Sequence, residues 1–143
     1  MDMRCALAVL LFGAAAAMTG VVAQQPRAGS YTSEQATAGR QVYQSHCARC
    51  HGARLDGGAS GPAVTGEAFA RALDVGPMSA PQLYDFITSH MPRAQPGSLT
   101  DEQFLQAFAF LLSANGYPTG ETPLTKRTLS TMALRPYPVR TPR

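Results

Sequence analysis

Cysteine is scarce in this 143-residue chain, with three residues in all. Cys5 lies in the apolar N-terminal stretch, so Cys47 and Cys50 are the two that remain after it. If both serve another chemistry, no pair is left for a disulfide, even in an oxidising compartment that would allow one. A small chain without that cross-link needs a further source of core stability.

Alternation of apolar and polar residues with a period of two is also missing, which argues against a β-sheet. Three segments instead place a hydroxyl residue three positions before a glutamine, an arrangement typical of a helix N-terminus. They are Thr32–Gln35, Ser79–Gln82 and Thr100–Gln103. A weaker helix is expected near 67–73 with Thr65 as its cap, and residues 52–66 are a glycine-rich loop. We therefore predict an all-α fold without internal repeats.

The expected helices carry apolar faces. On the last helix apolar residues recur every three or four positions, and they are Phe104, Ala107, Phe108, Leu111 and Leu112. On the middle helix, about 80–90, the predicted apolar face is Leu83, Phe86 and Ile87. Gly39 on the first helix would let another helix cross closely, and the aromatic-rich last helix is the expected partner.

Basic residues are few in the body of the chain and concentrate at its end. Residues 24–116 carry a net charge of −1, whereas residues 117–143 carry +4. No basic stripe interleaved with aromatics appears in the body, so we expect no nucleic-acid binding. The prolines at 118, 123, 136, 138 and 142 predict an extended, proline-rich basic tail over 119–143. Docking to an acidic partner, wrapping around the body and a solvated end all remain open for this tail.

The first 23 residues resemble a secretory signal. Arg4 precedes an apolar, alanine-rich run that ends at Ala23, where cleavage is expected. An uncleaved membrane anchor is the alternative. Cleavage predicts an exported, periplasmic chain without a membrane span, followed by a flexible leader over 24–31 and a domain over 32–118.

The pattern Cys-x-x-Cys-His at residues 47–51 indicates the chemistry. On a helical turn the sulfurs of Cys47 and Cys50 project from one face and can each add to a haem vinyl group, while His51 reaches the iron. A thioredoxin-like dithiol needs no histidine and lies in a β-α-β unit, and a structural zinc site needs four ligands. The sequence therefore predicts one covalently bound haem c, because there is no second such motif.

The second axial ligand of the iron separates electron carriers from catalysts. We predict Met91, because Pro92 forces it out of the helix into an extended conformation. His90 is the alternative and would give a lower reduction potential. Met78 and Met132 are expected to fill the core, and His46 to face solvent.

Residues around the haem are expected to support it. A ligating histidine generally donates its second ring nitrogen to an acceptor, and the carbonyl of Pro62 is the candidate for His51. Tyr84, Arg54 and Arg93 are candidates for contacts with the haem propionates, or plain surface residues.

Together these motifs resemble the class I c-type cytochromes, in particular bacterial single-haem cytochromes and cytochrome subunits that serve periplasmic dehydrogenases. The resemblance covers about 32–118 and is carried by Gly39, residues 47–52, Gly61-Pro62, Met91-Pro92, residues 96–99 and residues 110–118. It implies a helical bundle around one haem c, His51 and Met91 as axial ligands, Pro62 as acceptor, and crossing first and last helices. The tail has no counterpart in the minimal fold.

The predicted activity is one-electron transfer, as a free carrier or as the cytochrome subunit of an oxidoreductase complex rather than as an enzyme itself. The expected partners are redox proteins, such as the large subunit of a periplasmic dehydrogenase and a terminal oxidase or another cytochrome. A catalytic or ligand-sensing haem protein with a displaceable sixth ligand is the alternative.

Overall fold

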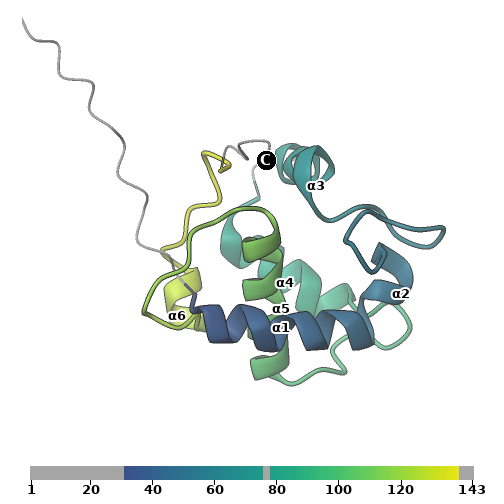
Figure 1. Ribbon diagram of the computed structural model, residues 1–143, viewed down its shortest axis with the longest axis horizontal. Coiled ribbons are helices and arrows are strands. Elements are labelled where there is room, and N and C mark those ends of the chain that lie inside the picture. Colours follow the sequence, from purple (N-terminus) through teal and green to yellow (C-terminus); the bar gives the residue numbers. More distant parts are fainter. Residues whose placement is uncertain (1–30, 76–77, 139–143) are drawn as a thin grey trace, which may run out of the picture.

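The computed structural model describes residues 31–75 and 78–138, and in that part of the chain it is helical (Figure 1). The helices are α1 (Ser33–His46), α2 (Ala48–His51), α3 (Gly66–Asp74), α4 (Ala80–His90), α5 (Asp101–Ala114) and α6 (Lys126–Leu129). Within the described residues, β-type pairing is limited to an isolated bridge between Gly58 and Gly61. The prediction of an all-α fold is confirmed.

The three predicted helix starts are present. Thr32, Ser79 and Thr100 each accept a hydrogen bond from the backbone N–H of the glutamine three residues later, and each glutamine side chain bonds back to the cap. The reciprocal bonds satisfy amides that have no partner inside the helix. Thr65 precedes α3 without a capping bond, and its hydroxyl donates instead to the carbonyl of Leu55 at 3.3 Å.

The framework of the molecule is the crossing of α1 and α5, as the sequence predicts. Gly39 is buried where the helices meet, and a Cβ placed on it would lie 1.8 Å from the carbonyl oxygen of Gln106. Glycine is therefore required for this close approach. Next to the crossing, the rings of Tyr43 and Phe110 pack with centroids 5.4 Å apart.

The buried face of α4 differs from the prediction. Ala80 and Tyr84 are the buried residues of this helix, and the Tyr84 ring packs edge-on against Phe108 of α5. Phe86 is 43% exposed, because it lies about 200° around the helix from Tyr84. Its ring stacks on His90, with centroids 4.7 Å apart. Leu83 and Ile87 are partly buried and pack against the core, as expected.

The segment after residue 118 wraps around the body. Leu124, Leu129 and Leu134 are buried in the same core cluster as α1, α4 and α5. Their spacing of five residues matches neither helix nor strand, so periodicity in the sequence does not reveal this packing. Met78 and Met132 pack partly buried against this cluster. Of the three possibilities for the tail, the structure shows the second: residues 119–138 wrap around the body.

The N-terminal boundary of the domain also differs from the prediction. Tyr31, assigned to the flexible leader, is 1% exposed. Its hydroxyl donates to the carbonyl of Tyr117, and its own carbonyl accepts from the amide of Gly120 at 2.8 Å. The predicted signal peptide over 1–23 and leader residues 24–30 lie outside the described residues, as do 139–143. Within the described residues, every helix is too short or too polar to span a bilayer.

Candidate haem site

The Cys-x-x-Cys-His motif forms its own short helix at the end of α1. Cys47 ends α1 and caps α2, which turns the chain there. The carbonyl of Cys47 accepts from the amide of His51 at 3.0 Å, closing one helical turn. Cys47, Cys50 and His51 are all half-buried. Two sulfurs and one imidazole are thus presented from a single turn, as covalent haem attachment requires.

His51 is held in one orientation by the following loop. Its Nδ1 lies 2.8 Å from the carbonyl oxygen of Pro62, the contact that the sequence suggested. Because a carbonyl oxygen only accepts, Nδ1 carries the proton and Nε2 keeps its lone pair free for a metal. Gly61 makes the contact possible, since a Cβ there would lie 3.1 Å from the His51 ring. This role of Gly61 was not part of the sequence prediction.

Two residues tie the loop 52–65 to the helical framework. The hydroxyl of Tyr43, on α1, donates to the carbonyl of Gly52 at 2.7 Å. The side chain of Asn115 is buried at the end of α5, where its Oδ1 accepts from the amide of Gly66 at 3.0 Å and its Nδ2 donates to Val64 at 3.0 Å. The sequence showed Asn115 only as a helix end. An asparagine before glycine at that point gives no signal of such a distant contact.

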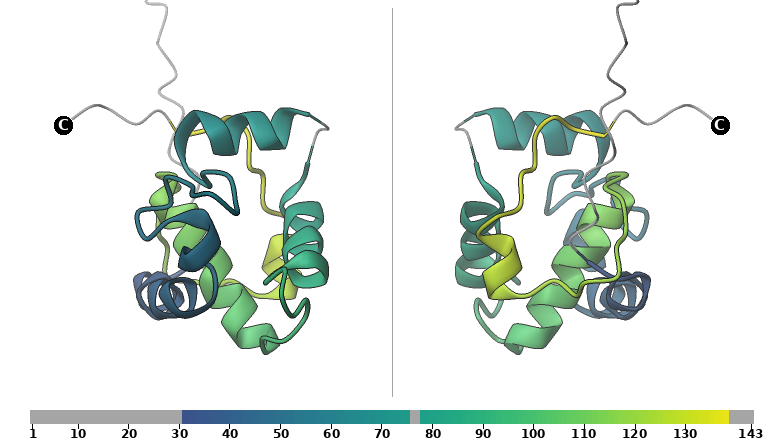
Figure 2. Two further views of the ribbon diagram at one scale, coloured as in Figure 1. Left: turned by 90° about the vertical axis from the view of Figure 1, so that its right-hand side faces the viewer. Right: turned by 90° about the vertical axis from the view of Figure 1, so that its left-hand side faces the viewer.

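Met91 lies at the end of α4, on the other side of the site. Its backbone is extended (φ −122°, ψ 150°), as the following proline predicts, and its side chain is half-buried. Leu83 and Ile87 are spaced by four residues and lie along one stripe of α4, and Met91 follows directly after its last turn. Figure 2 shows α2 and α4 on opposite sides of the molecule, with α3 across one end.

The neighbouring candidates are engaged elsewhere or exposed. His90 is exposed, with Nδ1 3.0 Å from the carbonyl of Phe86. Arg54 pairs with Asp56 at 3.1 Å, and Arg93 is exposed. Tyr84 is buried between α4 and α5, and its hydroxyl has no hydrogen-bond partner. The structure gives none of these side chains a contact that marks a propionate site.

The rival uses of the two cysteines find little support. Burial raises the pKa of the Cys47 thiol to about 11, with a further rise from Cys50. A redox-active dithiol needs the opposite, a lowered thiol pKa. Within residues 31–75 and 78–138, no three histidine, cysteine or acidic side chains gather as a metal site. Two sulfurs, an imidazole with a free Nε2 and a thioether fit a covalently attached haem instead.

The fold and the donor set define a class I c-type cytochrome, whose cofactor is one covalently bound haem c and whose role is haem electron transfer. A family model described as cytochrome C oxidase, cbb3-type, subunit III matches residues 34–111, more than half of the chain. The chain therefore belongs to that family.

One solved structure supports the fold independently. It is the sulfane dehydrogenase SoxCD from Paracoccus pantotrophus, with a TM-score of 0.57 and 24% sequence identity. The match covers 78% of this chain and 57% of that chain, so this chain spans little more than half of its length. No curated protein sequence matches the chain.

Proposed function

We propose that this chain is a periplasmic single-haem electron carrier with His51 and Met91 as the axial ligands of the iron. The observation that carries the proposal is the contact between His51 Nδ1 and the carbonyl of Pro62 at 2.8 Å, which leaves Nε2 available as a ligand. Met91 comes from α4, on the opposite side of the molecule from α2 (Figure 2). His51 and Met91 would then hold the iron from either side.

The residues of the chain determine how the site works. Haem bound here supplies a one-electron ferric–ferrous couple. Cys47 and Cys50 hold the ring through two thioether bonds, and the Pro62 carbonyl keeps the His51 imidazole in place. The thioether of Met91 favours ferrous iron and so raises the reduction potential. Ligands fixed on helices change little between the two oxidation states, which suits electron transfer.

The partners and the location belong to the same proposal. The family is named after an oxidase subunit, and the similar solved structure is a dehydrogenase complex. We assign to this chain a large dehydrogenase subunit as electron donor and a terminal oxidase or another cytochrome as acceptor. The signal-like residues 1–23 support export to the periplasm. The chain would act as a carrier or as a cytochrome subunit, without catalysis of its own.

Replacing Met91 with alanine tests the axial ligand. Met91→Ala should remove the sulfur-to-iron absorption band of the ferric protein. It should also lower the reduction potential by on the order of 0.1–0.3 V, a part of the range that axial ligands control. Met132→Leu is the control, because it removes a thioether but keeps the apolar contact of this half-buried residue with the core, and it should leave both quantities unchanged. Persistence of the band in Met91→Ala, or its absence from the unaltered protein, would contradict the assignment.

Carbon monoxide binding separates the carrier from a catalytic or sensing haem protein. A carrier with both axial positions filled should bind carbon monoxide slowly and weakly in the ferrous state. Rapid binding to the unaltered protein at neutral pH, together with a high-spin ferric spectrum, would instead favour a displaceable or absent sixth ligand.

A further inference from the structure

The chain's last described segment braces the helix that ends at Met91. We call residues 124–137 the C-terminal strap. Its helix α6 packs against α4, and the buried Leu129 lines a hollow there together with Tyr84 and Thr88 of α4. Lys126, at the start of α6, pairs with Asp101 of α5 at 2.5 Å. The strap therefore supports α4 along its flank.

The start of the strap is anchored far away in sequence, on α1. The side chain of Gln35 donates to the carbonyl of Leu124 at 3.0 Å and accepts from its amide at 2.6 Å. Because Gln35 also belongs to the capping box of α1, this anchor is fixed to the α1–α5 framework. The strap thus begins on the rigid part of the molecule.

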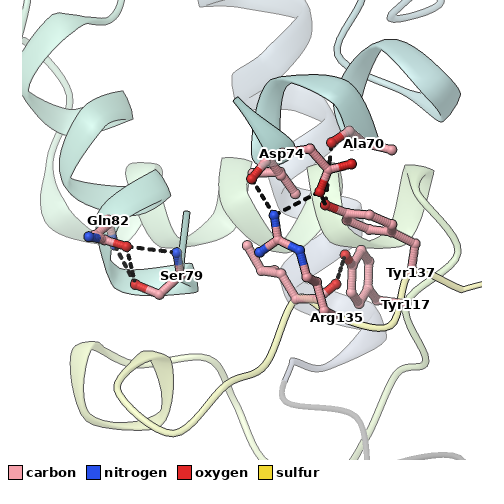
Figure 3. Close-up of polar contacts among 9 residues, drawn as sticks. Ala70, Asp74, Ser79, Gln82, Tyr117, Arg135 and Tyr137 are labelled. Atoms are coloured by element: carbon pink, nitrogen blue, oxygen red, sulfur yellow. Dashed lines mark hydrogen bonds and ion pairs between the residues drawn. The ribbon is translucent and has the colours of Figure 1, made fainter. Parts of the chain in front are cut away.

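The end of the strap clamps the junction between α3 and α4 (Figure 3). The Arg135 guanidinium donates to the carbonyl of Leu73 and to Asp74 Oδ1, the latter at 2.9 Å. The Tyr137 hydroxyl donates to the same carboxylate at 3.0 Å and lies 3.3 Å from the carbonyl of Ala70. A cation at a helix C-terminus satisfies free carbonyls and complements the helix dipole.

The Leu73 carbonyl also links the end of α3 to the residue before the cap of α4. The Leu73 carbonyl that accepts from Arg135 also accepts from the amide of Met78 at 3.3 Å. Met78 directly precedes Ser79, the cap of α4. Phe69 and Leu73 reach the core, but within the described residues α3 has no extensive contact with another helix. The strap therefore adds its hydrogen bonds to the core contacts of Phe69 and Leu73 in holding α3.

We propose that the C-terminal strap is a positioning element for the sixth ligand, with Arg135 and Tyr137 as its positioning residues. By fixing the α3–α4 junction and the flank of α4, it keeps Met91 from being displaced by an external ligand. This inference rests on the proposed function in taking Met91 as the ligand. The haem attachment on α2 does not depend on the strap.

The test compares the full-length holoprotein with Arg135→Ala/Tyr137→Phe. Imidazole is titrated into the ferric protein, and amide hydrogen exchange is measured helix by helix. Loss of charge-assisted hydrogen bonds should make α3 and α4 open about tenfold more often. Imidazole affinity should rise about tenfold, with α1, α2 and α5 exchanging as before. Tyr137→Phe alone, which keeps the ring, should shift both quantities less and in the same direction.

The matched control is Arg127→Ala, which removes one positive charge from an exposed position of α6. It should leave imidazole affinity and exchange unchanged. Imidazole affinity within twofold of the unaltered protein, or an equal rise of exchange in all helices, would overturn the inference. If the unaltered protein lacks the sulfur-to-iron band, the proposed function fails instead. A rise of amide exchange confined to α3 and α4 in Arg135→Ala/Tyr137→Phe would then still support the strap as the brace of α4. No rise in these two helices would contradict that role.

Discussion

The two sides of the haem site are held together in different ways. On the His51 side the contacts next to the motif are local: Tyr43 bonds Gly52 nine residues away, and His51 meets Pro62 eleven residues away. Asn115 adds a distant contact to the same loop, from 49 to 51 residues away. On the Met91 side, Arg135 and Tyr137 reach back 61 to 67 residues to α3. The covalent end of the site thus depends mainly on its own neighbourhood. The exchangeable end depends on a distant segment.

This contrast indicates that the two sides can be weakened separately. Closing a long loop costs slightly more conformational entropy than closing a short one, and exposed contacts open locally without global unfolding. The α1–α5 crossing is common to both sides, because it carries the motif at one end and faces α4 at the other. Damage at the crossing should therefore affect both sides, whereas damage elsewhere should affect one.

The largest expected effect comes from Gly39→Ala. Its Cβ would lie 1.8 Å from the carbonyl oxygen of Gln106, so α1 and α5 must separate. We expect a loss of about 3 kcal/mol or more in the free energy of unfolding, at the upper end of overpacking costs. Denaturant unfolding of the holoprotein measures it. Arg40→Ala, at the exposed next position, is the control. A loss below about 0.5 kcal/mol would mean that the crossing is looser than the structure has it.

A smaller and one-sided effect is expected from Asn115→Ala. The change leaves the Gly66 amide and the carbonyl of Val64 without their partner, which should cost about 2–3 kcal/mol in unfolding free energy. Amide exchange should rise in the loop 52–65, while imidazole affinity, which reports the Met91 side, stays within twofold. Asn115→Asp keeps the acceptor for the Gly66 amide and should lose less unfolding free energy than Asn115→Ala. If imidazole affinity rose in Asn115→Ala as much as in Arg135→Ala/Tyr137→Phe, the two sides of the site would not be independent.

The same contrast explains what the sequence could predict. The capping boxes, the haem motif and the His51–Pro62 contact all join residues close in sequence, where spacing alone specifies geometry. The crossing at Gly39 was also predictable, because a helical glycine facing an aromatic-rich helix has few other uses. The strap was not, since its three leucines recur every five residues, a period of neither helix nor strand, and its partners on α3 lie 61 to 67 residues away. Phe86 was misplaced because an apolar residue on a short helix does not show which neighbour the helix will face.

The smallest expected effect is the acid sensitivity of the strap. Hydrogen bonds from Arg135 and then Tyr137 hold the pKa of Asp74 below its usual value. A carboxylate with a lowered pKa stabilises the fold fully above its unfolded pKa of about 3.9 and loses that contribution as the pH falls through the folded value. Asp74→Asn should therefore have a slightly lower Tm than the unaltered protein from about pH 5 upward, and the difference should vanish in acid.

Thermal unfolding of both proteins between about pH 2 and pH 7 measures this difference in Tm. The acid end of the range is accessible because covalently attached haem stays on the chain. The effect is small, since the Asp74 side chain is 58% exposed and solvent screens its pairing with Arg135. Glu121→Gln, at an exposed position just before the strap, is the control and should change Tm little at any pH. A Tm difference that grows as the pH falls would mean that Asp74 is protonated more easily in the folded state. The clamp would then not be an ion pair, and the hydrogen bonds of Arg135 and Tyr137 to the carbonyls of Leu73 and Ala70 would hold α3 on the Met91 side.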